Sequence, residues 1–544
     1  MAQAPKPYLI SEFKTGISNY LSPWIRPQDA FEPLDNAYIY RGVVNKRSGY
    51  TPFAAATVDA KPIMGIMVWM NQSTGVETLV VATTVNLYYY NGTAFTAVTA
   101  PPTFTGTIAN FFNWTNWQAS TAATSYLYFT NNKDNVGRFT TVTYSSLVPV
   151  IDGSGQTINS ALDVKVYKQR LLLIRPTLSV NGVQNQSIYW SAVQNDSLWR
   201  VDLAGQGGNL DAPTGDIIIS AEFIRDVLVV FFSHSTWIFR YTGNDNAPFR
   251  WDKINISKAT NAPYGTVAYD ERCTSIGNTG FIACDGANVQ RYDVSIVDYY
   301  ETSFSEKYYG QAFSERYDNL SQAWTLYCST TNSNPIIGSV APGSDKALVY
   351  NFLENTWATY SFTTPLTCLG TFHVLNDATW ASLNTSPQNL WVNTSLPWNA
   401  YIMQKLSPNL LAGDTTGHVY VMDSGNETDN GTAIPVMIQT TRWNPIIDIG
   451  QRVQFIYIDV YYNKISTPAI TLKIEFFIDN GNDVIATRSL TIDASTEELS
   501  NFKRVYVNLV SQFVKMQITS SDPSIFQILG FILWVTPSGR LTKP

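Results

Sequence analysis

The residues best suited to acid–base chemistry are few in this chain. Histidine is the side chain that most readily exchanges protons near neutral pH, and the 544 residues include only three, His234, His373 and His418. None lies near a nucleophile motif, since G-x-S-x-G, HExxH and a Walker loop are all absent from the sequence. His234 stands in a polar turn and His418 follows Gly417. We therefore interpret both as solvated loop histidines.

Paired carboxylates would be needed for a different reaction, the hydrolysis of a glycosidic bond. Asp226, Asp270, Asp285 and Glu222 are the acidic residues that could converge at the centre of a ring of strands. Their spacing along the chain does not establish that they do. The Ser-x-Asp-x-Gly-x-Thr-Trp boxes typical of sialidases are also missing. A glycoside hydrolase is therefore the third-ranked function, and we expect the protein not to be an enzyme.

Metal and cofactor motifs are similarly weak. The loop Asp479–Asp483 resembles a calcium loop but lacks the bidentate glutamate at its twelfth position, and a hairpin turn explains it. Gly205–Gly208 lacks the Lys-Ser/Thr of a phosphate-binding loop. The four cysteines are too few and too widely spaced for a disulfide framework or a CxxC site. We expect no catalytic residue, cofactor or metal ligand, and four buried cysteines, with a Cys273–Cys284 cross-link left open.

Aromatic side chains suggest a second kind of function. Sugar faces stack on tryptophan and tyrosine rings, and five of the 15 tryptophans lie outside the best strand candidates: Trp114, Trp117, Trp380, Trp391 and Trp398. The alternative is that most aromatic residues fill the contacts between sheets. A glycan-binding surface, through the C-terminal module or the tryptophan-rich stretch near residues 376–400, is the second-ranked function.

Charge and targeting features narrow the choice further. The formal net charge is −7, only 14% of residues are charged, and no dense run of lysine or arginine occurs. Tight binding to a phosphate backbone is therefore not expected. The N-terminus lacks a basic segment followed by an apolar core, and the longest apolar run, Phe526–Val535, is too short to span a bilayer. We expect a soluble protein made in the cytoplasm.

The elements that would position these residues are repeated hairpins. In Asp226–Gly243 an apolar run, Val227–Phe232, meets the polar turn Ser233–Ser235 and a second apolar run, Trp237–Tyr241. Leu79–Gly92 and Thr266–Gln290 have the same pattern. Repeats at a fixed period indicate an architecture in which each unit buries its faces against its neighbours.

Cycles of four short strands can be followed from Pro62 onward. Their second strands begin near residues 79, 126, 171, 228, 281, 324 and 410, a spacing of 43–57 except for the last interval, which contains an insertion near 376–400. Four strands every 40–50 residues is typical of a β-propeller. We predict an all-β fold with a propeller of about seven blades, between five and eight, over residues 61–425. The alternative is a series of unrelated hairpins in a large sandwich.

Two other segments flank this region. Residues 1–60 are interrupted by prolines and contain one strand candidate, Asn36–Val44, which we predict completes the last blade because an open ring would expose an edge. Residues 426–544 predict a C-terminal β-sandwich, because seven longer strands alternate there between apolar and polar residues. Within it, Asn480-Gly481 predicts a type I′ hairpin turn.

Four segments resemble a known family. Gly16–Tyr50 combines a proline-rich lead, an asparagine before a strand and a basic turn ending in Arg-x-Gly-Tyr. This opening, together with Ser191–Val201, Gly277–Tyr292 and Leu411–Asp423, is similar in order to the tail hub proteins of short-tailed bacteriophages, also called nozzle or packaged-DNA stabilisation proteins.

The resemblance implies a structural role in the virion tail. Such proteins form a ring of identical subunits, usually six, below the portal and adaptor proteins. The ring retains the packaged DNA and later passes it, and it carries spikes, fibres or a plug. The family has no catalytic residues to transfer. An acidic, lightly charged surface is compatible with DNA sliding through without being held, and the expected location is the virion.

Overall fold

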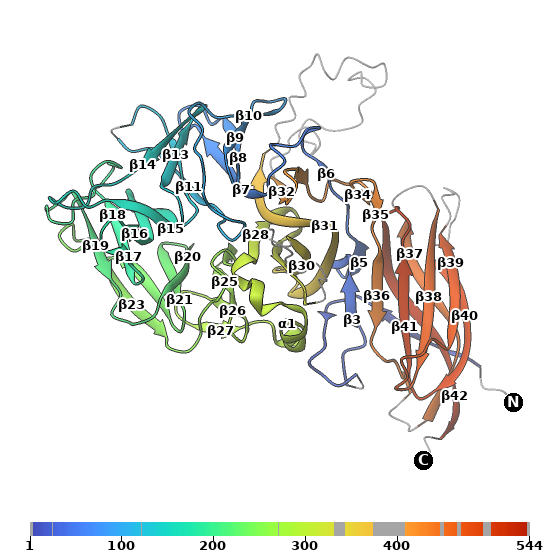
Figure 1. The fold of residues 1–544 in the computed structure, drawn as a ribbon. Helices are drawn as coiled ribbons and strands as arrows, with labels where there is room; N and C mark the ends of the chain where they lie inside the picture. Colours follow the sequence, from blue (N-terminus) through green and yellow to red (C-terminus); the bar gives the residue numbers. More distant parts are fainter. Residues whose placement is uncertain are drawn as a thin grey trace.

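The computed structural model describes residues 4–23, 25–120, 122–269, 271–330, 343–373, 408–446, 451–464, 469–492 and 502–540. Strands dominate these residues, as Figure 1 shows, and the expectation of an all-β protein is confirmed. The described helical elements are short: α1 (Val297–Ser303), η1 (Val294–Ile296), η2 (Glu306–Gln311) and η3 (Asp318–Leu320). The insertion near 376–400 lies outside the described residues.

Five antiparallel sheets, each with four strands in meander order, follow one another along the chain. The first contains β7 (Ile63–Met70), β8 (Glu77–Thr83), β9 (Leu87–Tyr90) and β10 (Phe95–Ala97). The second contains β11 (Asn113–Trp117), β12 (Tyr126–Thr130), β13 (Val136–Thr140) and β14 (Thr143–Leu147). The third contains β15 (Ile158–Tyr167), β16 (Arg170–Leu178), β18 (Ser187–Ser191) and β19 (Gly207–Asp211), with the short β17 (Gly182–Val183) beside β16. The fourth contains β20 (Ile218–Ile224), β21 (Val227–Phe232), β22 (Thr236–Tyr241) and β23 (Phe249–Asn255), and the fifth contains β24 (Val267–Tyr269), β25 (Arg272–Gly277), β26 (Gly280–Cys284) and β27 (Val289–Arg291).

Two further four-strand runs share one long strand. The first run is β28 (Phe313–Tyr317), β29 (Gln322–Tyr327), β30 (Ser344–Asn351) and β31 (Thr356–Phe372). The second run starts from the last part of β31 and continues through β32 (Asn409–Asp414), β33 (Val419–Val421) and the N-terminal β6 (Thr51–Pro52). A strand from the start of the chain therefore pairs at the end of the last run.

The first strands of these seven runs contact one another in order. Contacts run from β7 to β11, β15, β20, β24, β28 and β31, and β31 contacts β7 again. The hairpin predicted over Asp226–Gly243 is confirmed. It consists of β21 and β22, whose register pairs Val230 with Trp237. Successive runs bury their apolar faces against each other, as in the cluster formed by Leu172, Ile174, Leu228 and Phe239 from the third and fourth sheets.

Several strand boundaries differ from the prediction. The sequence predicts Ser295–Tyr300 as the fourth strand of the fifth cycle. This segment lies in η1 and α1 instead, because so short an apolar run does not distinguish strand from helix. Leu198–Asp202 lies outside the strands, since Trp199 is buried there and donates its indole N–H to the Asp196 carbonyl at 2.6 Å. The fourth strand of that sheet is β19 instead. In the fifth sheet the predicted second strand, beginning near residue 281, is β26, and the strand before it, β25, was not predicted.

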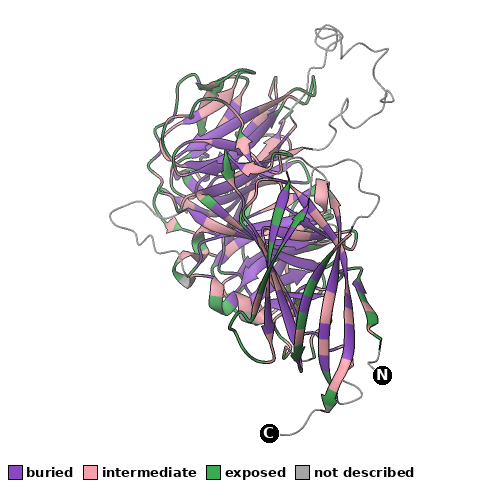
Figure 2. Ribbon diagram, turned by 90° about the vertical axis from the view of Figure 1, so that its right-hand side faces the viewer, coloured by how far each residue is buried: buried purple, intermediate pink, exposed green. Residues whose placement is uncertain are grey.

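The C-terminal strands form two sheets. One contains β36 (Val436–Thr440), β41 (Val514–Ser520), β38 (Ile470–Ile478) and β39 (Ala486–Ile492); the other contains β42 (Phe526–Arg540), β37 (Gln451–Lys464) and β40 (Phe502–Ser511). All seven predicted strands are present. Their inward residues, among them Leu472, Phe476, Val460 and Leu533, belong to one apolar cluster. Figure 2 shows the resulting alternation of buried and exposed positions along these strands.

The predicted type I′ turn at Asn480-Gly481 is wrong. Neither residue has the positive φ that this turn requires. Asp479 has a φ of 48° instead, and its carboxylate accepts hydrogen bonds from the backbone N–H groups of Gln512 (2.6 Å) and Phe513 (3.2 Å). These hydrogen bonds fix Asp479, the first residue of the connection between β38 and β39. The Asp479 carboxylate therefore has a structural role.

The N-terminal strands are distributed over both parts of the molecule. β1 (Lys6–Ser11) pairs along β42, β2 (Gly16–Ile17) pairs with β3 (Ala30–Asp35), and β3 lies between β31 and β36. Figure 1 shows these blue strands between the yellow and the orange sheets. The segment from residue 6 to residue 52 therefore joins the repeated sheets to the C-terminal sheets.

The prediction for Asn36–Val44 is wrong in two respects. The segment is a hairpin, β4 (Ala37–Tyr40) and β5 (Val43–Lys46), whose two-residue turn places Arg41 and Gly42 at positive φ (54° and 73°). β5 pairs with β42 and not with the last four-strand run. The strand that pairs with the last four-strand run is β6, which follows β5 in the chain.

Candidate functional site

An ionic cluster with a buried aspartate and three partly exposed partners lies on the first strands of three sheets. β15 carries Asp163 and Lys165, and β20 carries Glu222. The Lys165 Nζ lies 2.7 Å from Glu222 Oε2 and 3.8 Å from Asp163 Oδ2. Glu315 on β28 interacts electrostatically with both Glu222 and Lys165. The lysine thus lies between carboxylates, which makes this an internal ion network and not a free acid–base pair.

Burial controls the protonation of this cluster. It raises the pKa of Asp163 to about 7, against the opposing charge of Lys165, and it raises the pKa of Glu315 to about 7. Burial opposes the charge on Lys165, but the nearby carboxylates Asp163 and Glu222 outweigh it and raise the pKa of the lysine. At neutral pH the cluster therefore holds a charged lysine, and the carboxyl groups of Asp163 and Glu315 are close to their titration midpoints.

The three predicted carboxylates that the structure describes do not converge. Of the candidates, Glu222 belongs to the cluster, whereas Asp226 lies in the turn after β20 with 90% of its side chain exposed. Asp285 accepts hydrogen bonds from the backbone of its own turn, at Ala287 and Asn288, and Asp270 lies outside the described residues. Asp163 and Glu315 were missed; the polar residues flanking Val164 in an otherwise apolar strand were the available signal.

The pH dependence of stability tests the buried state of Asp163. A folded-state pKa near 7, above the ordinary aspartate value of about 3.9, means that the folded chain binds more protons than the unfolded chain between these pH values. The free energy of unfolding therefore falls as pH rises through this window, by up to about 1.4 kcal/mol per pH unit for this group. We expect Asp163→Asn to remove that part of the slope in urea denaturations at pH 4.5–7. The exposed control Asp226→Asn should keep the wild-type slope, and identical slopes in all three proteins would contradict the assignment.

The histidines divide into two groups. His234 is 75% exposed in its turn, 3.0 Å from the Ser233 hydroxyl, and His418 lies 3.0 Å from the Thr416 hydroxyl, so the interpretation of both as loop histidines is confirmed. His373 differs, because its Nδ1 lies 2.8 Å from Glu77 Oε2 across two sheets.

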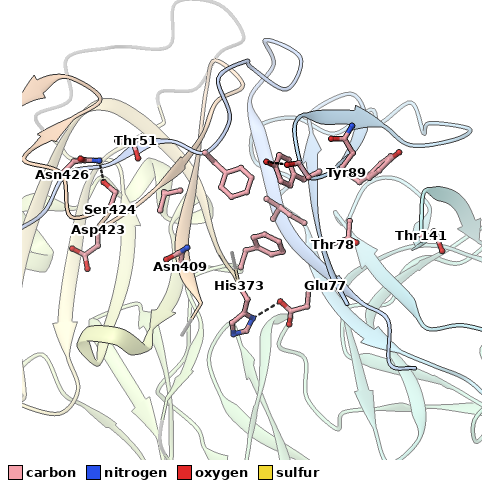
Figure 3. A pocket seen from close by; sticks show the side chains of 17 residues that line it. Thr51, Glu77, Thr78, Tyr89, Thr141, His373, Asn409, Asp423, Ser424 and Asn426 are labelled. Atoms are coloured by element: carbon pink, nitrogen blue, oxygen red, sulfur yellow. Dashed lines mark hydrogen bonds and ion pairs between the residues drawn. The ribbon is translucent and has the colours of Figure 1, made fainter. Parts of the chain in front are cut away.

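That pair lines a cleft of about 800 Å³, drawn in Figure 3. One wall consists of residues from β8, β9 and the turn after β9, with Thr141 from the second sheet. The other consists of residues from β6 and the segment after it, the end of β31, the start of β32, and β33 with the segment that follows it. Aromatic rings form part of the lining: the Phe53 ring centroid lies 4.9 Å from that of Tyr90 and 6.1 Å from that of Phe372. The cleft thus lies where the first and last four-strand runs meet.

A third polar site is a fully enclosed junction around the basic turn of the N-terminal segment. Arg47 donates to both carboxylate oxygens of Asp429 at 2.8 and 2.6 Å, and both side chains are 3% exposed. The Arg47 guanidinium also donates to the Asn36 side-chain oxygen (2.7 Å) and the Ser361 carbonyl (3.0 Å). One arginine therefore connects the N-terminal segment, β31 and the chain leading into the C-terminal sheets.

Lys46, next in the same turn, is buried as well. Its Nζ donates to the backbone carbonyls of Asp522 (2.6 Å) and Ser524 (3.2 Å). Burial, followed by the charge of Arg47, lowers the pKa of this lysine to about 8. The basic turn therefore faces protein on both sides and is not a surface for phosphate.

The outer face of the C-terminal sheet β40–β37–β42 carries aromatic rings in register. Tyr457 lies between Tyr506 and Trp534 on the neighbouring strands. The Arg504 guanidinium lies 4.0 Å from the Tyr457 ring centroid and forms a two-bond pair with Asp459 (2.7 and 2.9 Å). Tyr506 is 65% exposed. Tyrosine, tryptophan and arginine are the residues most enriched in protein–protein interfaces.

The remaining candidates have structural environments or fall outside the description. The four cysteines are buried and free, and Cys273 faces Cys284 across β25 and β26. Trp114 and Trp117 lie on β11, with Trp117 buried, while Trp380, Trp391 and Trp398 are outside the described residues. In the described part of the chain, no group of three or more His, Cys, Asp and Glu could hold a metal ion, and no helix is long and apolar enough to cross a bilayer.

No known protein-family model matches this chain, and no curated protein is significantly similar to it in sequence.

Proposed function

We propose that the protein is a tail hub, or nozzle, subunit of a short-tailed bacteriophage. In this role six identical copies form a ring below the portal and adaptor proteins, and the ring retains and later passes the packaged DNA. Spikes, fibres or a plug attach to it, and the mature location is the virion after synthesis in the host cytoplasm. The resemblance of the sequence motifs and their order is the starting point of this proposal.

The fold that we infer is a seven-bladed β-propeller followed by a β-sandwich. Supporting it are the seven four-strand runs and the contacts of their first strands, which pass from β7 through β31 and return to β7. The pairing of β6 with β33 would close the last blade with a strand from the start of the chain. The shared apolar cluster of the two C-terminal sheets supports the sandwich.

The observation that carries the functional proposal is the buried junction. The motif on which the resemblance chiefly rests includes Asn36, Arg47 and Gly49, and these residues join the N-terminal segment to both other parts of the chain. A conduit under the pressure of packaged DNA needs its modules fixed to one another. Backbone pairing of β3 with β31 and β36 provides that connection here.

Partner binding and charge are compatible with the same role. The face formed by the exposed Tyr506 and the partly exposed Tyr457 and Trp534 has the composition of a subunit contact. The net charge of −7 disfavours tight binding of DNA. The ionic cluster of Lys165 and Glu222 lacks the open carboxylate pair of a glycosidase, so a passive role is favoured over hydrolysis.

Electron microscopy of virions tests this proposal. We expect antibodies raised against the purified chain to label one end, the tail, of particles produced by the phage that encodes it. Reconstruction of that tail should show a cyclic ring into which these sheets fit. Antibody labelling of the capsid in place of the tail, or absence of the chain from purified particles, would contradict the proposal.

A further inference from the structure

The cleft between the first and last four-strand runs contains polar groups that no atom of the described residues satisfies. The Tyr89 hydroxyl, the Asn409 amide and the Thr78 and Thr141 hydroxyls all line it. None of these four side chains has a hydrogen-bond partner among the described residues, whereas neighbouring Asn426 donates to the Ser424 hydroxyl at 3.0 Å. The cleft thus presents several uncommitted neutral donors and acceptors from both of its walls.

The charge of the lining restricts what can bind. Among the described lining residues there is no lysine or arginine, so this part of the chain supplies no fixed cation for a phosphate, sulfate or carboxylate group. Its acidic residues are engaged: Glu77 is paired with His373, and Asp423 accepts a hydrogen bond from the Tyr317 hydroxyl at 2.7 Å. Nucleotides and acidic polymers are therefore disfavoured.

Size and aromatic content favour one class of ligand. A volume of about 800 Å³ lies within the usual range for small-molecule sites, about 300–1,000 Å³. The rings of Tyr89, Tyr90 and Phe53 are partly exposed beside the uncommitted hydroxyl and amide groups. Ring faces pack against the apolar C–H face of a sugar, while hydroxyl and amide groups bind its equatorial hydroxyls.

We propose that this cleft is a binding site for a neutral oligosaccharide. The Tyr89 ring provides a stacking surface, and Asn409 and Thr78 provide hydrogen bonds from opposite walls. The Glu77–His373 pair offers one acceptor and one donor at the floor of the same cleft. This site does not depend on the conduit function, and it lies on the repeated sheets and not on the C-terminal module.

Binding to immobilised saccharides tests the proposal with the full chain. An array of neutral and acidic oligosaccharides should retain the protein on neutral members, and calorimetry with the best soluble member should give a single site. Tyr89→Ala should weaken that affinity about tenfold, the value of one lost ring contact. Asn409→Ala, a smaller change that preserves the aromatic packing, should weaken it in the same direction.

The control is Tyr20→Ala, which removes an exposed tyrosine from the N-terminal segment and should leave the affinity unchanged. Thermal unfolding of each variant separates loss of binding from loss of fold. Retention only on acidic members, no retention at all, or binding that both cleft variants leave intact would overturn the site. Release of new reducing ends from a bound saccharide would replace binding by hydrolysis and would also count against the proposed passive function, which virion labelling tests separately.

Discussion

Replacing Arg47 by methionine is expected to lower the free energy of unfolding by about 3–5 kcal/mol. The substitution leaves the Asp429 carboxylate buried without its two charged hydrogen bonds, and it removes the donors to Asn36 and Ser361. Desolvation of an unpaired carboxylate is the main cost. Urea denaturation followed by tryptophan fluorescence measures the change.

Arg250→Met is the matched control. Arg250 also pairs with an aspartate, Asp252 at 3.3 Å, but its side chain is 61% exposed. Exposed ion pairs contribute little to stability, so this variant should have the same urea midpoint as the wild type. The double variant Arg47→Met/Asp429→Leu should recover part of the lost stability, because no unpaired charge remains. Equal midpoints for Arg47→Met and Arg250→Met would show that the junction does not stabilise the fold.

Gly49→Ala is expected to be similarly damaging, with a loss of about 3 kcal/mol or more, the upper end for overpacking. An added Cβ would lie 1.9 Å from the Thr428 carbonyl oxygen and 2.3 Å from its carbon. The backbone cannot easily retreat, because the Gly49 N–H donates to the Asn426 carbonyl at 2.7 Å. The variant should show a lower thermal midpoint by circular dichroism and faster proteolysis of the N-terminal segment.

Gly215→Ala provides the comparison for that experiment. A Cβ at Gly215 meets no atom within 4 Å, and no positive φ is required there, so the midpoint should stay at the wild-type value. If both glycine variants behaved alike, the close approach of the two backbone segments at Gly49 would be disproved.

Local patterns were sufficient to predict most strands but not their partners. Alternation of apolar and polar residues placed β38 and β39 at their observed bounds, and the hairpin of β21 and β22 was predicted from its turn. Prediction of turns from residue type was wrong where distant contacts determine the conformation. Arg41-Gly42 forms a tight hairpin turn, whereas Asn480-Gly481 does not form the predicted type I′ turn. In the second case the Asp479 carboxylate accepts hydrogen bonds from the backbone N–H groups of Gln512 and Phe513, in the distant connection between β40 and β41, and no local rule contains these contacts.

The sites were predicted less well than the strands, for a physical reason. Glu222 was identified, but its partner Lys165 lies 57 residues away, and Glu315 is further still. Their proximity is a product of how successive sheets pack, which spacing along the chain does not encode. The basic turn at Lys46 and Arg47 was noticed as a motif, yet only the three-dimensional arrangement shows that both cations are internal.

The position of the N-terminal strands also affects how the chain is made. Arg47 and Asp429 are separated by 382 positions, so at ordinary translation rates of about 5–20 residues per second the first segment waits roughly 20–80 seconds on the ribosome before its partner emerges. For most of that interval β3 has only β2 to pair with, and β6 has no partner, because β31, β36 and β33 are made much later. Pairing of the N-terminal strands with their distant partners is thus a late folding step of high contact order, whose timing depends on the end of synthesis.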